Sequence, residues 1–148
     1  MNIEIIAELA QGYEGRPEQA RLLMKAAATA GADVAKYQLV YADELATPDY
    51  KYYELFKTLE MAEEVWIELA TYAKELNIQL NLDIFGIRSL KLAEKIDVPS
   101  IKLHGTDIAN IGLLSEVARS KVQRIILGAG GAHSGELWQA LEILANKQ

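Results

Sequence analysis

Residues 3–40, IEIIAELAQGYEGRPEQARLLMKAAATAGADVAKYQLV, decide the fold because they read as a strand, a helix and a second strand. The strands are expected over residues 3–9 and 33–40, where apolar and β-branched side chains dominate. Residues 16–30 carry apolar or small side chains at helical spacing, with Pro17 in the first turn and Gly31 after the last. Two strands joined by a helix predict a parallel pair with a right-handed crossover.

The same alternation continues along the rest of the chain. Further strands are expected over residues 78–84, 100–103 and 124–128, and helices over 63–76, 89–96, 110–119 (capped by Asn110) and from Gly135 to the C-terminus. Residues 41–62 form a longer connection rich in Tyr, Asp and Glu. Five strand–helix units without a break in composition predict one α/β domain over residues 1–148. Two architectures fit: about five of the eight units of a TIM-type barrel, or a complete five-stranded flavodoxin-like sheet.

Composition narrows the class of protein. The 148 residues carry a formal net charge of −6, and 51% of them are apolar. An acidic balance argues against a nucleic-acid partner, which needs a basic face. Without cysteine there is no disulfide and no thiolate ligand or nucleophile. No apolar run reaches the roughly 20 residues of a membrane span, and Glu4 and Glu8 interrupt the N-terminal apolar run, so a cytoplasmic protein is expected.

Two lysines inside apolar strands are the strongest indication of a site. Parallel α/β folds place their sites at the carboxyl ends of the strands, where Lys36 and Lys102 are expected. A buried ammonium is costly unless it is paired with an anion. One interpretation is an internal salt bridge with Glu8 or Asp83. The other is that the lysines hold the phosphate or carboxylate of a ligand, and both can hold in turn.

Three other features near the strand ends allow both a structural and a functional interpretation. Glu8 shares a strand face with Glu4 and Ile6, which places its carboxylate toward the site end, where it can orient a hydroxyl or transfer a proton. The run Gly128-Ala129-Gly130-Gly131 is either a plain turn or a backbone cradle for an anion. His104 and His133 are at a separation that fits no metal motif, and loop histidines are the simpler interpretation.

Five segments together resemble the N-terminal barrel of the sialic acid synthase family. They are IIAELAQGYEG (5–15), AAATAGADVAKYQ (26–38), ELFKTLEMAEE (54–64), DVPSIKLHGTDIANIGLLSEVA (97–118) and RIILGAGGA (124–132). The family condenses phosphoenolpyruvate with an N-acyl mannosamine or a related sugar. The resemblance thus implies the N-terminal part of a TIM-barrel synthase of sialic-acid-like sugars, with about five of eight units present.

The resemblance also implies roles for particular residues. Glu8 matches the family's strand-one glutamate near the sugar. Lys36, Gln38 and Lys102 match residues near phosphoenolpyruvate, and Asp107 falls where the family has an acidic residue after strand four. The family's Mn²⁺ or Mg²⁺ is held by histidines of later strands, so its ligands are not expected in this chain. At the end of strand three the family has Ser-Thr-Pro-Phe, and this sequence has Leu82-Asp83-Ile84-Phe85 instead.

Two further expectations concern partners. The first is a small anionic metabolite, bound either in an active synthase or by a non-catalytic module of the same fold. The second is a homo-oligomer or a partner chain that completes the barrel, because five units leave two sheet edges open.

Overall fold

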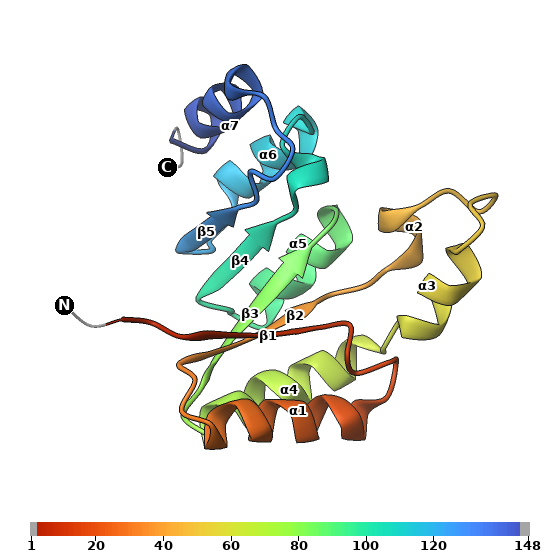
Figure 1. Ribbon diagram of the computed structural model, residues 1–148, viewed down its shortest axis with the longest axis vertical. Coiled ribbons are helices and arrows are strands. Elements are labelled where there is room, and N and C mark those ends of the chain that lie inside the picture. The colour runs from red at the N-terminus through yellow and green to blue at the C-terminus, as the bar shows by residue number, and fades with distance from the viewer. Residues whose placement is uncertain (1–2, 146–148) are drawn as a thin grey trace.

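Five parallel strands alternate with helices in the computed structural model, which describes residues 3–145 (Figure 1). The strands are β1 (Ile6–Ala10), β2 (Val34–Gln38), β3 (Gln79–Ile84), β4 (Ser100–Leu103) and β5 (Arg124–Leu127). The helices are α1 (Pro17–Thr29), α2 (Ala42–Leu45), α3 (Tyr53–Leu59), α4 (Glu63–Glu75), α5 (Ile87–Lys95), α6 (Ile111–Arg119) and α7 (Ser134–Ala145), with a 3₁₀ turn η1 (Gly105–Asp107). All five expected strands are therefore present, and the first begins three residues later than expected.

The order of the strands separates the two architectures. The sheet runs β1-β2-β3-β4-β5, with every neighbouring pair parallel. A flavodoxin-like sheet has the order 2-1-3-4-5, because its chain reverses direction across the sheet. A sequential order is that of a (β/α) barrel, in which each unit adds to the same edge. The structure is thus an open, five-stranded part of a barrel-type fold, and the flavodoxin-like alternative is wrong.

One face of the sheet makes the core with the helices. Tyr37, Leu82 and Ile101 alternate out of β2, β3 and β4 toward this face and are fully or almost fully buried. Met24 of α1 and Leu69 of α4 belong to the same cluster, and α1 packs beside α4 along this side of the sheet (Figure 1). The alternate side chains of the strands point to the opposite face, which carries most of the charged strand residues.

Local signals set the ends of the helices as expected. Pro17 is the first residue of α1, where its missing N–H is not needed. Gly31 has φ +84°, and the N–H of Ala32 bonds back to the carbonyl of Ala27, which closes the helix. Asn110 caps α6, since its side-chain oxygen accepts the N–H of Leu113 at 3.1 Å.

The long second connection contains structure that the sequence pattern did not predict. Residues 41–62 include α2 and α3 rather than an irregular excursion. Glu44 of α2 accepts the N–H of Arg88 at 2.6 Å and so caps the start of α5, 44 residues further along the chain. A Cβ on Gly86 would meet the Glu44 carboxylate, so a larger residue there would require this side chain to move. The last helix begins at Ser134, and its expected extension to the C-terminus lies outside the described residues.

The sheet curls so strongly that its two edges approach each other. Arg124 at the start of β5 forms an ion pair with Glu4, just before β1, at 2.5 Å. These residues flank the two outer strands of the sheet and are 120 positions apart in the chain. The face away from the helices is therefore concave, as the lumen of a barrel is. No helix among residues 3–145 is long and apolar enough to cross a membrane.

Candidate functional site

Strand register places the polar side chains of the concave face in two rows. In the first row Glu8, Lys36, Asn81 and Ser100 are successive partners across β1 to β4. In the second row, nearer the carboxyl ends, Gln38, Asp83 and Lys102 are partners across β2 to β4. Because partners in a parallel sheet point to the same face, side chains far apart in sequence form one layered site.

Four charged groups of this face form one connected cluster. Lys36 Nζ contacts a carboxylate oxygen of Glu8 and lies 3.4 Å from Asp83 Oδ2. Lys102 Nζ donates to the same Asp83 oxygen at 2.8 Å. Asp83 is fully buried, whereas 51% of the Glu8 side chain is exposed at the open edge. The two positive and two negative charges balance, so the internal salt bridge, one of the two interpretations of the lysines, is present.

The environment of Lys36 favours its charged form. Burial by itself would lower its pKa, but the hydrogen bond with Glu8 and the charges of Asp83 and Glu8 outweigh burial, and the pKa is raised above that of an ordinary lysine. Only 8% of its side chain is exposed. Lys36 is therefore a fixed ammonium within this cluster.

Backbone geometry at the end of β1 holds Glu8 in place. The register of β1 against β2 shifts between Glu8 and Ala10, and Ala10 has φ +47°, in the left-handed region. This turn brings the Ala10 N–H to 3.1 Å from Glu8 Oε1. Glu8 thus accepts a backbone hydrogen bond with one oxygen and contacts Lys36 with the other. Such a shift at a strand end is a recurrent way to aim a functional side chain.

Two buried acceptors on β3 lack partners within the described residues. Asn81 donates from its amide nitrogen to Ser100 Oγ at 2.6 Å, which leaves its Oδ1 without a hydrogen bond. Asp83 Oδ1 is also without one, although its other oxygen serves both lysines. Sequence reasoning placed Asp83 as a salt-bridge partner but did not rank Asn81, Asp83 or Ser100 among the site residues. The alternation Gln79, Asn81, Asp83 in an apolar strand was the signal available.

Glycines shape the opening above Lys102. A cavity of about 270 Å³ is lined by Lys102, His104, Gly105, Thr106, Gly128 and Gly130. A Cβ on Gly128 would lie 2.8 Å from the Gly105 nitrogen, so the loops after β4 and β5 can approach only without a side chain there. Gly131 has φ +80° and supplies the turn. Close loop packing thus accounts for Gly128, and turning the chain accounts for Gly131.

The remaining predicted residues lie around this cluster. Gln38 is half-buried in the second row, and its carbonyl accepts the Tyr13 hydroxyl at 2.9 Å. Asp107 lies in η1, where its carboxylate contacts Thr106 and Asn110, and it forms no ion pair with a residue between 3 and 145. His104 packs against Phe85, and the backbone of His133 donates to Glu136. The structure thus brings Glu8, Lys36, Gln38 and Lys102 together and leaves Asp107 at the rim.

The described part of the chain does not form a metal centre. Between residues 3 and 145 there is no group of three or more His, Asp or Glu side chains that could hold a metal ion. The divalent ion implied by the family resemblance therefore has no fitting site among these residues. The chemistry of the described site rests on lysines, carboxylates and hydrogen-bonding groups.

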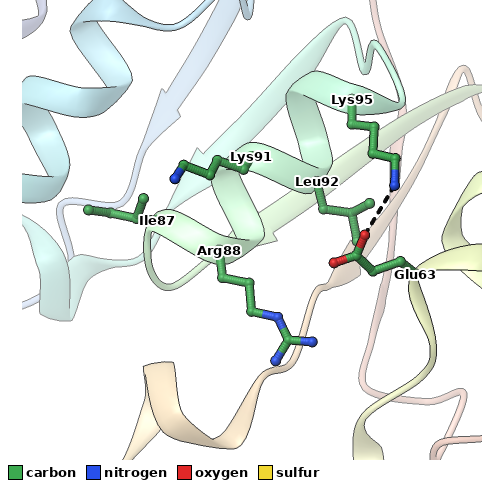
Figure 2. A pocket seen from close by; sticks show the side chains of 6 residues that line it. All are labelled: Glu63, Ile87, Arg88, Lys91, Leu92 and Lys95. Carbon is green, nitrogen blue, oxygen red and sulfur yellow. Dashed lines mark hydrogen bonds and ion pairs between the residues drawn. The ribbon is translucent and has the colours of Figure 1, made fainter.

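A second hollow lies on the helix layer, away from the lysine cluster. It has a volume of about 390 Å³ and is lined by Glu63, Ile87, Arg88, Lys91, Leu92 and Lys95. Lys95 Nζ lies 3.2 Å from Glu63 Oε2. Figure 2 shows this pair, and it shows Arg88 and Lys91 extending in different directions from α5. The Arg88 guanidinium lies 3.6 Å from the centre of the Tyr41 ring. These contacts join α5 to its neighbours, and none of the predicted site residues lies here.

The curled parallel sheet and its polar concave face define a protein of the (β/α)-barrel class. The NeuB family model matches residues 23–148, and the chain belongs to the NeuB family. An uncharacterized protein of Methanocaldococcus jannaschii is 32% identical over 142 residues, which cover 96% of this chain and 42% of that protein. The N,N'-diacetyllegionaminic acid synthase of Campylobacter jejuni is 27% identical over 154 residues, which cover 95% of this chain and 46% of that synthase.

A solved structure agrees over almost the whole chain. The N-acetylneuraminic acid (sialic acid) synthetase of Leptospira borgpetersenii, in complex with citrate, superimposes with a TM-score of 0.93 at 27% identity. The match covers 99% of this chain and 51% of that synthetase. The predicted resemblance to sialic acid synthases is therefore confirmed. The chain spans less than half the length of the two curated relatives and about half that of the solved synthetase.

Proposed function

We propose that this chain forms the N-terminal part of an enzyme that condenses phosphoenolpyruvate with an N-acyl mannosamine-type sugar. The observation that carries the proposal is the pair of ammonium groups, Lys36 and Lys102, on the concave face toward the carboxyl ends of the strands. Sialic-acid-type synthases among the relatives, and the citrate in the Leptospira synthetase structure, support a ligand with acidic groups.

Different residues of the chain would bind the two substrates. Lys36 and Lys102 would neutralise the acidic groups of phosphoenolpyruvate and stabilise the negative charge that develops in the transition state. Glu8, which is half exposed at the edge, would accept a hydrogen bond from a hydroxyl of the sugar and so orient the sugar. Gln38 lies beside Asp83 in the row that faces the ligand. Any Mn²⁺ or Mg²⁺ that the reaction needs would take its ligands from outside the described residues.

A second candidate is a non-catalytic module that binds an acidic metabolite. One observation favours it: both lysines and their carboxylate partners lie within residues 3–145, so anion binding there needs no residue from another part of the protein. Both candidates require that anions bind at the lysines, and they differ in whether product forms.

Thermal unfolding with phosphoenolpyruvate, with and without Mn²⁺, tests the anion site. We expect phosphoenolpyruvate at about 100 times its dissociation constant to add about 2.7 kcal/mol of stability, because it binds only the folded state. For a domain of this size that raises Tm by roughly 5–10 °C. The shift should persist in EDTA, because the lysines do not depend on metal.

Matched variants assign the effect to the lysines. Lys36→Met and Lys102→Met should each abolish most of the shift, whereas Lys121→Met, at an exposed position on another part of the fold, should retain it. No shift in the unaltered protein would contradict the proposed function. Sugar-dependent consumption of phosphoenolpyruvate separates the enzyme from the binding module.

A further inference from the structure

Asp83 occupies the position between the two lysines that a bound anion would need. Its Oδ2 lies 2.8 Å from Lys102 Nζ and 3.4 Å from Lys36 Nζ, so one oxygen serves both ammonium groups. The 2.8 Å contact has the length of a charge-assisted hydrogen bond. The carboxylate is fully buried, and β3 fixes it between β2 and β4.

Two unpaired acceptor atoms of β3 on the concave face also disfavour a bound anion. Asp83 Oδ1 and Asn81 Oδ1 are buried acceptors without hydrogen-bond partners among the described residues. An incoming phosphate or carboxylate would bring more acceptor oxygens to a region that already has a surplus. It would also have to share the lysines with a carboxylate that cannot turn into solvent, and breaking a buried pair is strongly unfavourable.

Glu8 is a weaker competitor for the same lysines. Of the two lysines it contacts only Lys36, and half of its side chain is exposed, so its carboxylate stays hydrated when a ligand takes its place beside Lys36. The two carboxylates therefore differ in kind: Glu8 is displaceable, and Asp83 is built in.

We propose that Asp83 is an internal counter-ion that sets the ligand preference of this site, by reducing its affinity for strongly anionic ligands. The inference rests on the proposed function to the extent that the lysines are the anion-binding groups. It predicts that the unaltered protein binds a dianion such as inorganic phosphate weakly, and that removing the Asp83 charge creates a strong anion site.

Calorimetric titration of inorganic phosphate and of phosphoenolpyruvate tests the proposal. We expect Asp83→Asn, which keeps the shape and removes the charge, to bind both at least about 10-fold more tightly than the unaltered protein, because a nearby charge shifts such equilibria by a factor of this order. Glu8→Gln should gain less. Glu68→Gln removes one charge from an exposed position of α4 and should not change the affinity.

Stability supplies a readout that a merely structural role would not give. Asp83→Asn should unfold at a lower temperature, because both lysines lose a buried partner, and phosphate should restore Tm more than chloride does at equal ionic strength. Adding Lys102→Met to Asp83→Asn should remove this rescue. If Asp83→Asn does not fold, the unaltered protein decides: tight phosphate binding that Lys102→Met abolishes would show that the buried carboxylate does not weaken the site, and would overturn the proposal.

The outcomes also separate this inference from the proposed function. If phosphoenolpyruvate binds the unaltered protein through the lysines and Asp83→Asn binds it no better, the counter-ion role is overturned and the proposed function stands. If Asp83→Asn alone binds phosphoenolpyruvate, the counter-ion role stands and the proposed function is overturned. If no anion binds any variant, both are overturned.

Discussion

Tyr13 connects the loop after β1 to the strand that carries Lys36 and Gln38. Its side chain is fully buried, and its hydroxyl donates to the Gln38 carbonyl at 2.9 Å. The ring meets those of Tyr37 and Trp66 edge-on, with centroids 6.1 and 5.6 Å away. Burial raises the pKa of Tyr13 well above the ordinary value for tyrosine, because the charged form would lose its hydration.

Tyr13→Phe should therefore lower the free energy of unfolding by an amount that depends on pH. Near neutral pH we expect a loss of about 1 kcal/mol for the missing hydrogen bond. Above the ordinary tyrosine pKa of about 10, the unfolded chain releases the phenol proton while the folded protein retains it, so stability falls by about 1.4 kcal/mol per pH unit. The variant lacks this loss, so urea unfolding at about pH 11 should show the difference vanish.

The comparison with an exposed tyrosine completes this test. Tyr50→Phe should change stability little at either pH, because Tyr50 is 44% exposed and its phenol remains in contact with water. A Tyr13→Phe penalty that is the same at neutral and alkaline pH would contradict the effect of burial on this phenol.

The sequence singled out the lysines of the cluster but not the partner that they share. Lys36 and Lys102 stood out because each interrupts an apolar strand. Their shared partner, Asp83, could not be assigned from the sequence. It is 47 positions from Lys36 and 19 positions from Lys102, and it meets both only because of the register of three strands. A register shift of one residue would turn Asp83 to the helix side. Charge pairing of this kind is decided by tertiary structure.

At the scale of elements, the sequence predicted the regular units well and the second connection poorly. The strands and the helices α1, α4 and α6 follow from apolar spacing with Pro17, Gly31 and Asn110 at their ends. Helix α2 has only four residues, too few for a periodic pattern, and α3 has Tyr52 exposed just before its start and Leu55 exposed within it. The role of α2 is to bring Glu44 to α5, and no local pattern encodes such a contact.

Gly128→Ala tests the close packing of the loops after β4 and β5. Its new Cβ would lie 2.8 Å from the Gly105 nitrogen and 2.9 Å from the Leu103 carbonyl oxygen, both backbone atoms that cannot turn away. We expect a loss of about 1–3 kcal/mol, as for overpacking elsewhere in folded proteins, measured by urea unfolding.

A second glycine gives the matched control. Gly112 lies in the first turn of α6, and its nearest neighbour for a new Cβ is Asn110 Oδ1 at 3.6 Å, an ordinary contact. Gly112→Ala should be neutral or stabilising by up to about 1 kcal/mol, because alanine favours a helix over glycine. Equal effects of the two substitutions would contradict a steric requirement at Gly128.

At the scale of the whole molecule, the two outer strands and the last helix present unpaired surfaces. Within residues 3–145, β1 pairs only with β2, and β5 only with β4. Ile3 and Ile5 beside β1 are exposed, as are Trp138 and Leu141 on α7. Unpaired strand edges beside apolar side chains favour association with another chain. We propose that further strands cover these edges, from a second copy or from a partner that completes the barrel.

Sedimentation of the isolated 148-residue chain tests this surface. We expect a concentration-dependent equilibrium with larger species, and Trp138→Lys should weaken it at least about 10-fold, because a charge replaces a large apolar contact. Ile67→Lys is the control, since Ile67 is also an exposed apolar residue but lies on α4, which packs against α1 and β3. A chain that remains monomeric at high concentration, or equal effects of the two variants, would contradict association through this surface.

The sequential strand order also has a consequence for synthesis on the ribosome. Each strand pairs with the strand that precedes it in the chain, so a growing chain never needs a later segment before β1, β2 and β3 can form their ladders. Every new unit docks on an edge that is already in place, so each step closes only the segment between two successive strands. The fold can thus be built in the order in which it is translated, with the Glu4–Arg124 pair made only after the fifth strand has emerged.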